Sequence, residues 1–129
     1  MIVDTSALIA VLRDEDGAER IIQALAASRD LRMSAANWLE TAIVVDANSD
    51  PVLSGRFDSL VATIGIVLEP VTPDQARVAR QAYRDFGKGR HPAGLNFGDC
   101  FSYALARTSG QPLLFKGDDF ALTDVEPAT

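Results

Sequence analysis

Asp4 is the residue of this sequence whose place in the chain most needs a chemical explanation. It lies between the apolar pair Ile2-Val3 and the apolar stretch 7–12, and burying an ionised carboxylate is costly unless a cation or hydrogen bonds compensate. Carboxylate oxygens are the ligands that a hard cation such as Mg²⁺ prefers, whereas a zinc site calls for His and Cys side chains. Three further acids lie within or beside predicted helices and strands: Glu40, Asp99 and Asp118.

Each acid also has an ordinary structural explanation. Asp4 can cap the helix that follows it, because Asp is a preferred N-cap residue. Glu40 can be a solvated helix residue, and Asp99 lies in the first turn of a predicted helix, where the helix dipole stabilises an acid. Asp118 and Asp119 suit an ordinary turn. Taken one at a time, these explanations are as good as a chemical role.

Composition places the chain among ordinary soluble proteins. It has 129 residues, 47% of them hydrophobic and 23% charged, which predicts one domain spanning residues 1–129. A single cysteine, Cys100, excludes an internal disulfide. No apolar run approaches the roughly 18 residues that cross a bilayer, so we expect a cytoplasmic protein. The formal net charge of −6 argues against nucleic-acid binding by bulk attraction.

Strand and helix signals alternate through the first half of the chain. Residues 2–3 indicate a short strand, followed by a helix over 7–12 with Thr5 or Ser6 as its cap. Apolar spacing predicts a second helix over 18–27, and residues 31–33 indicate another short strand. Ser34 then caps a third helix. The residues predicted for the apolar face of that helix are Trp38, Leu39, Ala42 and Ile43, with Glu40 just beside them.

The second half continues the alternation. Asp50-Pro51 starts a helix that leads to a β-branched strand at 66–68. In residues 72–75 the Thr is a cap, the Pro takes the first helical position and the Gln closes a capping box, so we predict a helix over 73–86. A glycine-rich loop at 87–98 precedes a helix that ends at Gly110, and residues 112–115 indicate a last central strand. The residues predicted to face inward from that last helix are Phe97, Phe101, Ala104 and Leu105.

Strands separated by helices predict an α/β fold with a central, mostly parallel sheet of four to five strands and helices on both faces. Ligands of such sheets collect at the carboxyl ends of the strands. Asp4 and Asp118 each follow a predicted strand, so we expect them to share that edge.

Four motifs, taken in order, match the pattern of one family. They are Met-Ile-Val-Asp-Thr-Ser-Ala-Leu at 1–8, the segment 34–40 that ends in Glu40, Asn-Phe-Gly-Asp-Cys at 96–100, and Leu-Leu-Phe-Lys-Gly-Asp-Asp-Phe at 113–120. Across essentially its whole length the chain resembles the PIN-domain ribonucleases, specifically the VapC-type toxins of bacterial toxin–antitoxin pairs. The resemblance implies a PIN-like α/β/α sandwich.

The resemblance also implies an activity and a site. The activity is a Mg²⁺- or Mn²⁺-dependent endoribonuclease that cuts single-stranded or loop RNA, in tRNA, rRNA or mRNA, and leaves a 5′-phosphate and a 3′-hydroxyl. Four clustered carboxylates repel, so at least one pKa should be raised without metal. Thr5 or Ser6 can hold a carboxylate or a water, or simply cap the helix. The catalytic and metal-binding residues carried over are Asp4, Glu40, Asp99 and Asp118, with Asp119 as the alternative to the last.

A VapB-type antitoxin and a second copy of the chain are the protein partners that the resemblance implies. The antitoxin should lay an amphipathic segment into an apolar groove. The residues that we expect to line this groove are Ile9, Leu12, Ile43 and Val44.

Positive charge gathers in one segment despite the acidic total. Residues 77–91 carry five basic groups against the single acid Asp85, a net +4, whereas the rest of the chain has a net charge of −10. We expect Arg84, Lys88 and Arg90 to bind backbone phosphates of RNA. A solvated helix face is the ordinary alternative, and the two arginines that precede them can instead pair with antitoxin acids.

Other classes of function fit an acidic α/β sheet less well. A haloacid-dehalogenase-like phosphatase, which forms an aspartyl phosphate, needs a second Asp two positions after the first, where this chain has Ser6. A receiver domain needs a Lys after its last acidic strand, and here Lys116 precedes the acids. A catalytically silent PIN-fold binding module is the non-enzymatic alternative, although all four acids are present. His91 is not needed as a general base, since metal-activated water requires no imidazole.

Overall fold

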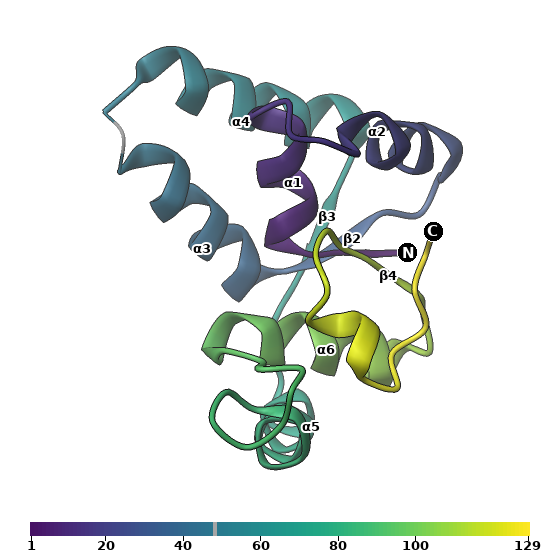
Figure 1. The fold of residues 1–129 in the computed structure, drawn as a ribbon. Helices are drawn as coiled ribbons and strands as arrows, with labels where there is room; N and C mark the ends of the chain where they lie inside the picture. The colour runs from purple at the N-terminus through teal and green to yellow at the C-terminus, as the bar shows by residue number, and fades with distance from the viewer. Residues whose placement is uncertain (48) are drawn as a thin grey trace.

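A four-stranded parallel sheet runs through the middle of the molecule, between two layers of helices (Figure 1). The computed structural model describes residues 1–47 and 49–129. The strand order is β3-β2-β1-β4, and every neighbouring pair is parallel. The predicted α/β/α sandwich is therefore confirmed. The strands are β1 Ile2–Val3, β2 Arg32–Ser34, β3 Val67–Glu69 and β4 Leu113–Leu114.

The order of the strands reverses beside β1. The chain adds β2 and then β3 on one side of β1, but it places β4 on the other side. In open parallel sheets, ligands bind outside the carboxyl ends of the strands at such a reversal. Asp4 follows β1 directly and therefore stands at this point of the sheet.

The strand at residues 112–115 was predicted to be central, and this prediction is wrong, because β4 is the last strand in the order. A segment near the C-terminus covers its outer side. The Leu113 amide donates to the Glu126 carbonyl oxygen (2.8 Å), and the Leu113 carbonyl accepts from the Ala128 amide (2.9 Å). The edge strand is thus as deeply buried as a central one, which explains its apolar sequence.

Side-chain caps fix where the helices begin. Ser34 and Thr72 cap α3 and α5 as predicted. Of the caps predicted for the first helix, Asp4 is confirmed and Thr5 and Ser6 are wrong, because the carboxylate of Asp4 accepts the capping hydrogen bond. Within the described residues, no helix is both long and apolar enough to cross a membrane. The helices are α1 Thr5–Leu12, α2 Ala18–Ala27, α3 Ala35–Asp46, α4 Pro51–Ile64, α5 Pro73–Phe86, α6 Phe97–Ser109 and the 3₁₀ turn η1 Phe120–Leu122.

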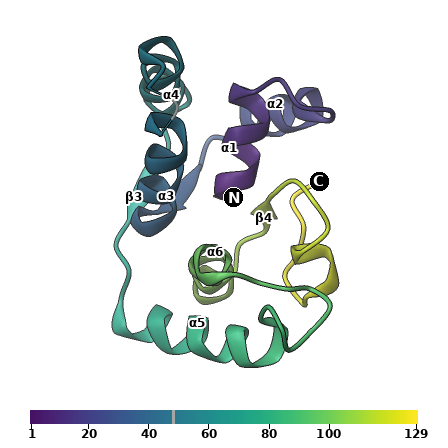
Figure 2. The same cartoon turned by 60° about the vertical axis from the view of Figure 1, so that its left-hand side comes forward.

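Neighbouring side chains of each strand point to opposite faces of the sheet, so the interior is divided into two cores. Val3 and Leu114 pack in the core that holds residues of α1, α2, α3 and α4. Ile2 and Leu113 point the other way, as neighbouring strand residues must, into the core under α5 and α6. Figure 2 shows α1 and α2 on one side of the molecule, with α6 and then α5 on the other. Helices from both layers therefore reach the carboxyl edge of the sheet.

The predicted apolar face of α3 is wrong in part. Leu39 and Ile43 are 53% and 59% exposed, whereas the polar side chains of Asn37 and Thr41 are completely buried. These two side chains face inward because they bond to neighbouring elements: Asn37 Nδ2 donates to the carbonyl oxygen of Gly98 (2.9 Å), and Thr41 donates to α1. The inward face of α3 is thus polar in part, beside apolar residues that pack in the core shared with α1, α2 and α4.

The prediction for α6 also needs a correction. Ala104 and Leu105 are buried as predicted, but Phe97 is 79% exposed. Phe97 is the first residue of α6, and the apolar residues that the second core takes from this helix begin at Cys100. An exposed phenylalanine therefore stands at the end of α6 nearest the acidic residues.

Candidate functional site

Asp4 is held rigidly at the carboxyl end of β1. Its side chain is nearly fully buried, at 2% exposure. Oδ2 accepts from the Ser6 backbone amide (2.9 Å), and Oδ1 accepts from the Ser102 hydroxyl of α6 (2.5 Å). These bonds compensate the burial of the carboxylate. The capping role and the buried position that the sequence left as alternatives are both present.

Glu40 reaches the same region from α3. Its Oε1 accepts from the Thr5 hydroxyl (2.5 Å) and from Asn37 Nδ2 (3.3 Å). Thr5 directly follows Asp4, so this bond ties the second acid to the residue next to the first. Of the two predicted supporting hydroxyls, Thr5 thus holds a carboxylate. Ser6 instead accepts from the Lys116 amide (3.0 Å) and ties α1 to the segment after β4.

Gly98 brings α6 against Glu40. A Cβ at this position would overlap Oε2 of Glu40 and lie 2.5 Å from its Cδ. Any side chain here would therefore displace the carboxylate, so glycine is required by a close approach. The neighbour of Gly98 in the chain is Asp99, and the same contact places the third acid next to the second.

Asp99 closes a capping box at the start of α6. Its amide donates to Asn96 Oδ1 (2.9 Å), and its Oδ2 accepts from the Asn96 amide (3.0 Å). Burial, together with the negative charges of Asp4, Asp119 and Glu40, raises the pKa of Asp99 to about 7, against the lowering effect of the Asn96 bond. One raised pKa among clustered acids is what the sequence predicts.

Asp118 and Asp119 lie in the exposed turn after β4. The charge of Asp119 contributes to the raised pKa of Asp99, whereas Asp118 is not among the charges that act on it. Asp119 also precedes η1 without capping it through its side chain, so its carboxylate has no role in that turn. The structure thus places the alternative fourth acid, Asp119, near enough to Asp99 for its charge to act there.

These residues fit a divalent cation that keeps part of its water shell. Within the described residues, no three His, Cys, Asp or Glu side chains form a ready-made cage around one ion. The donors that do converge are carboxylates, and the buried Oδ1 of Asn37, beside Glu40, has no hydrogen-bond partner among the described residues. Mg²⁺ is commonly held by one or two carboxylates plus waters and substrate phosphates. A site whose donor atoms are all oxygens, one of them without a hydrogen-bond partner, suits that chemistry.

Sequence reasoning missed three residues that shape the site: Asn37, Gly98 and Ser102. Asn37 precedes Glu40 by three residues, and Ser102 follows Asp99 by three, so each shares a helix face with an acid. That spacing was a usable signal. The contact of Gly98 was not readable, because it depends on how closely α3 and α6 pack.

The predicted RNA-binding residues Arg84, Lys88 and Arg90 are all exposed at the end of α5 and in the loop after it. None of them forms an ion pair with an acid in the described parts of the chain. Arg90 lies over the ring of Tyr83, 5.9 Å from its centroid. By contrast, Arg77 pairs with a neighbouring acid on the same helix. The C-terminal end of α5 and the following loop thus hold three cations that no acid of the described residues neutralises.

Comparison with known families decides where this fold and site belong. The family model described as PIN domain matches residues 1–126. The chain belongs to the PIN-domain family. Among relatives of this PIN domain, Ribonuclease VapC28 from Mycobacterium tuberculosis is 57% identical over 129 residues, which cover 99% of this chain and 97% of the relative. Ribonuclease VapC from Mycolicibacterium smegmatis is 53% identical over 125 residues, 97% of each chain. It is a VapC-type PIN domain.

Solved structures share the fold of this PIN domain. VapC20 from Mycobacterium tuberculosis, described as a Sarcin-Ricin loop cleaving toxin, superposes with a TM-score of 0.74 at 19% identity and covers 98% of both chains. A toxin-antitoxin complex from Klebsiella pneumoniae gives a TM-score of 0.70 at 19% identity, covering 95% of this chain and 92% of the other. At this identity the two structures establish the fold alone.

Proposed function

We propose that this VapC-type PIN domain is a toxin that hydrolyses phosphodiester bonds of single-stranded or loop RNA with the help of Mg²⁺ or Mn²⁺. The observation that carries the proposal is the set of contacts that links acids from three elements: Ser102 to Asp4, Thr5 to Glu40, and Gly98 against Glu40. These contacts lie where the strand order reverses. Relatives 51–57% identical are named ribonucleases.

The chain's own residues prepare the site before any cation binds. A bound divalent cation would supply positive charge to a phosphate and lower the pKa of a water to make a nucleophile. Hydrogen bonds already orient two of the carboxylates. Asp99, with a pKa of about 7, would bind a cation in its deprotonated form, so cation binding there would release a proton. The residues that would hold the cation are Asp4, Glu40, Asp99 and Asp119.

RNA would reach the acids along the basic segment. Arg84, Lys88 and Arg90 supply unpaired cations there, and phosphate binding by such groups releases counterions. Replacing all three with Ala should raise the RNA Kd and flatten its dependence on salt. A matched control replaces three exposed arginines of the opposite layer, Arg13, Arg20 and Arg29. If the two triple variants change the RNA Kd and its salt dependence equally, the basic segment has no special part in RNA binding.

An antitoxin of the VapB type is the proposed protein partner. Exposed apolar side chains support a docking face on α3 and α4: Ile43 is 59% and Val52 69% exposed. A cavity between α1 and α4, lined in part by Leu12, Val52 and Leu60, can take an amphipathic segment. Ile43→Glu should weaken binding of the cognate antitoxin and leave cleavage unchanged. Loss of cleavage in this variant, with binding intact, would contradict the assignment.

A homodimer is proposed as well, to be tested by light scattering.

Cleavage of end-labelled total RNA by the purified, antitoxin-free protein tests the proposed function. We expect discrete fragments with Mg²⁺ or Mn²⁺, none with EDTA, and none from Asp4→Asn or Asp99→Asn. Asp58→Asn, on the exposed surface of α4, is the control and should cleave normally. Cleavage that survives EDTA or both site variants would contradict the proposal, and intact RNA with folded, metal-loaded protein would favour a binding module.

A further inference from the structure

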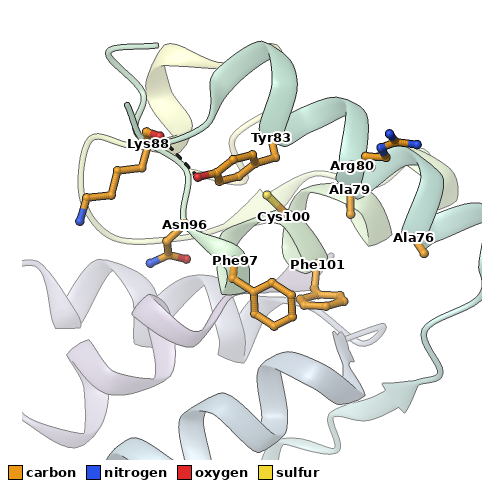
Figure 3. A pocket seen from close by; sticks show the side chains of 9 residues that line it. All are labelled: Ala76, Ala79, Arg80, Tyr83, Lys88, Asn96, Phe97, Cys100 and Phe101. Atoms are coloured by element: carbon orange, nitrogen blue, oxygen red, sulfur yellow. Dashed lines mark hydrogen bonds between the residues drawn. The ribbon is translucent and has the colours of Figure 1, made fainter. Parts of the chain in front are cut away.

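A cavity of about 640 Å³ opens between α5 and α6, and the predicted site residues do not account for it. Its walls are almost entirely apolar, and its two cations lie at opposite ends, as Figure 3 shows. The volume lies within the usual range for pockets that bind small organic groups. The lining residues are Ala76, Ala79, Arg80, Tyr83, Lys88, Asn96, Phe97, Cys100 and Phe101.

Aromatic rings form much of the wall. Phe97 is 79% exposed, and its ring meets that of Phe101 edge to face, with 4.9 Å between centroids. Tyr83 lies on the α5 side, partly exposed. Ala76 and Ala79, being small, leave the space that larger side chains would fill. An exposed, supported phenylalanine face beside an open cavity is a platform on which a flat ring can stack.

The cavity shares the first turn of α6 with the acidic site. Asn96, Phe97 and Cys100 belong to the same first turn of α6 as Asp99, and Asn96 exchanges two hydrogen bonds with Asp99. Burial, and then the charge of Asp99, raise the pKa of Cys100 to about 11, so the thiol is a neutral wall of the cavity. A group bound in the cavity would therefore lie one helical turn or less from a carboxylate of the site.

Charge selects among the possible occupants. Arg80 and Lys88 form no ion pair with any acid of the described chain, and they flank an apolar, aromatic interior (Figure 3). An unpaired nucleotide matches this arrangement, with a base that stacks and phosphates on either side. A purely apolar protein segment would leave both cations unpaired at the edges of the contact.

We infer that this cavity is a base pocket, in which an unpaired base of the RNA stacks on Phe97 while Arg80 and Lys88 hold the flanking phosphates. The inference rests on the proposed ribonuclease function and deepens it, because it assigns to this chain a feature that would choose which nucleotide is presented to the acids. The side-chain nitrogen Nδ2 of Asn96, which donates no hydrogen bond within the described residues, can donate to an acceptor on the base.

An abasic scan tests the pocket without relying on turnover. Binding of a fluorescein-labelled, single-stranded RNA of mixed sequence is measured by anisotropy in EDTA, and each base in turn is replaced by an abasic site. With the wild type, we expect one position at which loss of the base raises Kd by about tenfold. Phe97→Ala should raise Kd for the intact RNA by a similar factor, and the abasic site should then cause no further rise in Kd. Phe97→Tyr keeps an aromatic ring, so it should bind the intact RNA like the wild type and should again lose affinity at the abasic site.

The matched control is Ile22→Ala, which removes another exposed apolar side chain, on α2, and should bind like the wild type. Additive effects of Phe97→Ala and the abasic site would overturn the pocket. A change from dimer to monomer in Phe97→Ala by light scattering would also overturn it, in favour of an interface between copies. If the wild type cleaves RNA with Mg²⁺ while the scan is flat, the pocket fails and the ribonuclease stands. If the wild type neither binds nor cleaves RNA, both fail.

Discussion

Gly98→Ala is the smallest change that should disable the site while leaving every acid in place. The added Cβ would overlap Oε2 of Glu40, so the carboxylate must swing away. Its bonds to Thr5 and Asn37 are then broken or bent. The variant therefore moves one acid without removing a charge, which no Asp→Asn or Glu→Gln substitution can do.

The magnitude follows from what is displaced. Losing a hydrogen bond to a charged group costs about 1.5–3 kcal/mol, and the better helix propensity of Ala offsets up to about 1 kcal/mol of that. We expect a net loss in the free energy of unfolding of about 1–2 kcal/mol. Misplacing a reacting group by about 1 Å typically lowers rates by roughly a hundredfold, so kcat should fall by about that factor.

The assay combines denaturant unfolding with metal-dependent RNA cleavage. Gly55→Ala is the matched control, because a Cβ at this position on α4 meets nothing within 4 Å. It should gain about 0.5–1 kcal/mol of stability from helix propensity and cleave normally. Wild-type cleavage by Gly98→Ala, with Glu40→Gln inactive, would refute the close contact as a positioning device.

Three further predictions concern the other site residues. Because the pKa of Asp99 is raised from 3.8 to about 7, ionising it favours unfolding, so the metal-free protein should lose stability between about pH 4 and pH 7, by about 2 kcal/mol after allowance for solvent screening. Asp99→Asn should flatten this profile in denaturant titrations. Ser102→Ala strips a donor from the buried Asp4 and should cost about 1–3 kcal/mol of unfolding free energy. Asp119→Asn should reduce cleavage far more than Asp118→Asn in the same assay.

Each of these has a result that would contradict it. A stability profile that rises toward neutral pH in the wild type would mean that Asp99 ionises freely. Ser54→Ala controls for Ser102→Ala, since its hydroxyl bonds an acid on the exposed surface, and equal losses would deny any special cost of the buried pair. If Asp118→Asn reduces cleavage more than Asp119→Asn, the fourth acid of the site is Asp118, as the sequence resemblance implies.

Much of the fold was predictable because local signals agree with tertiary structure. The Thr72-Pro73 start and the apolar spacing of 18–27 predict helices whose ends match α5 and α2. The position of Asp4 after a strand was predictable as well, because a lone acid between apolar residues marks the end of a buried strand. In each case the determining contacts lie within a few residues in sequence.

The remainder depended on packing between distant segments. The apolar pattern of α3 misleads in part, because its inward face also holds the polar Asn37, which bonds to Gly98, 61 residues away. Phe97 misleads because helical spacing does not say where along α6 the core begins. Asp118 and Asp119 differ by one position in an exposed turn, and only the orientation of that turn relative to α6 distinguishes them.

The most direct test of the central claim, that acids from distant parts of the chain act as one metal site, is Mn²⁺ binding measured by electron paramagnetic resonance. We predict that Asp4→Asn, Glu40→Gln, Asp99→Asn and Asp119→Asn each weaken binding, whereas the exposed control Asp58→Asn binds like the wild type. Binding unchanged in all four variants, or weakened equally in the control, would contradict a single site.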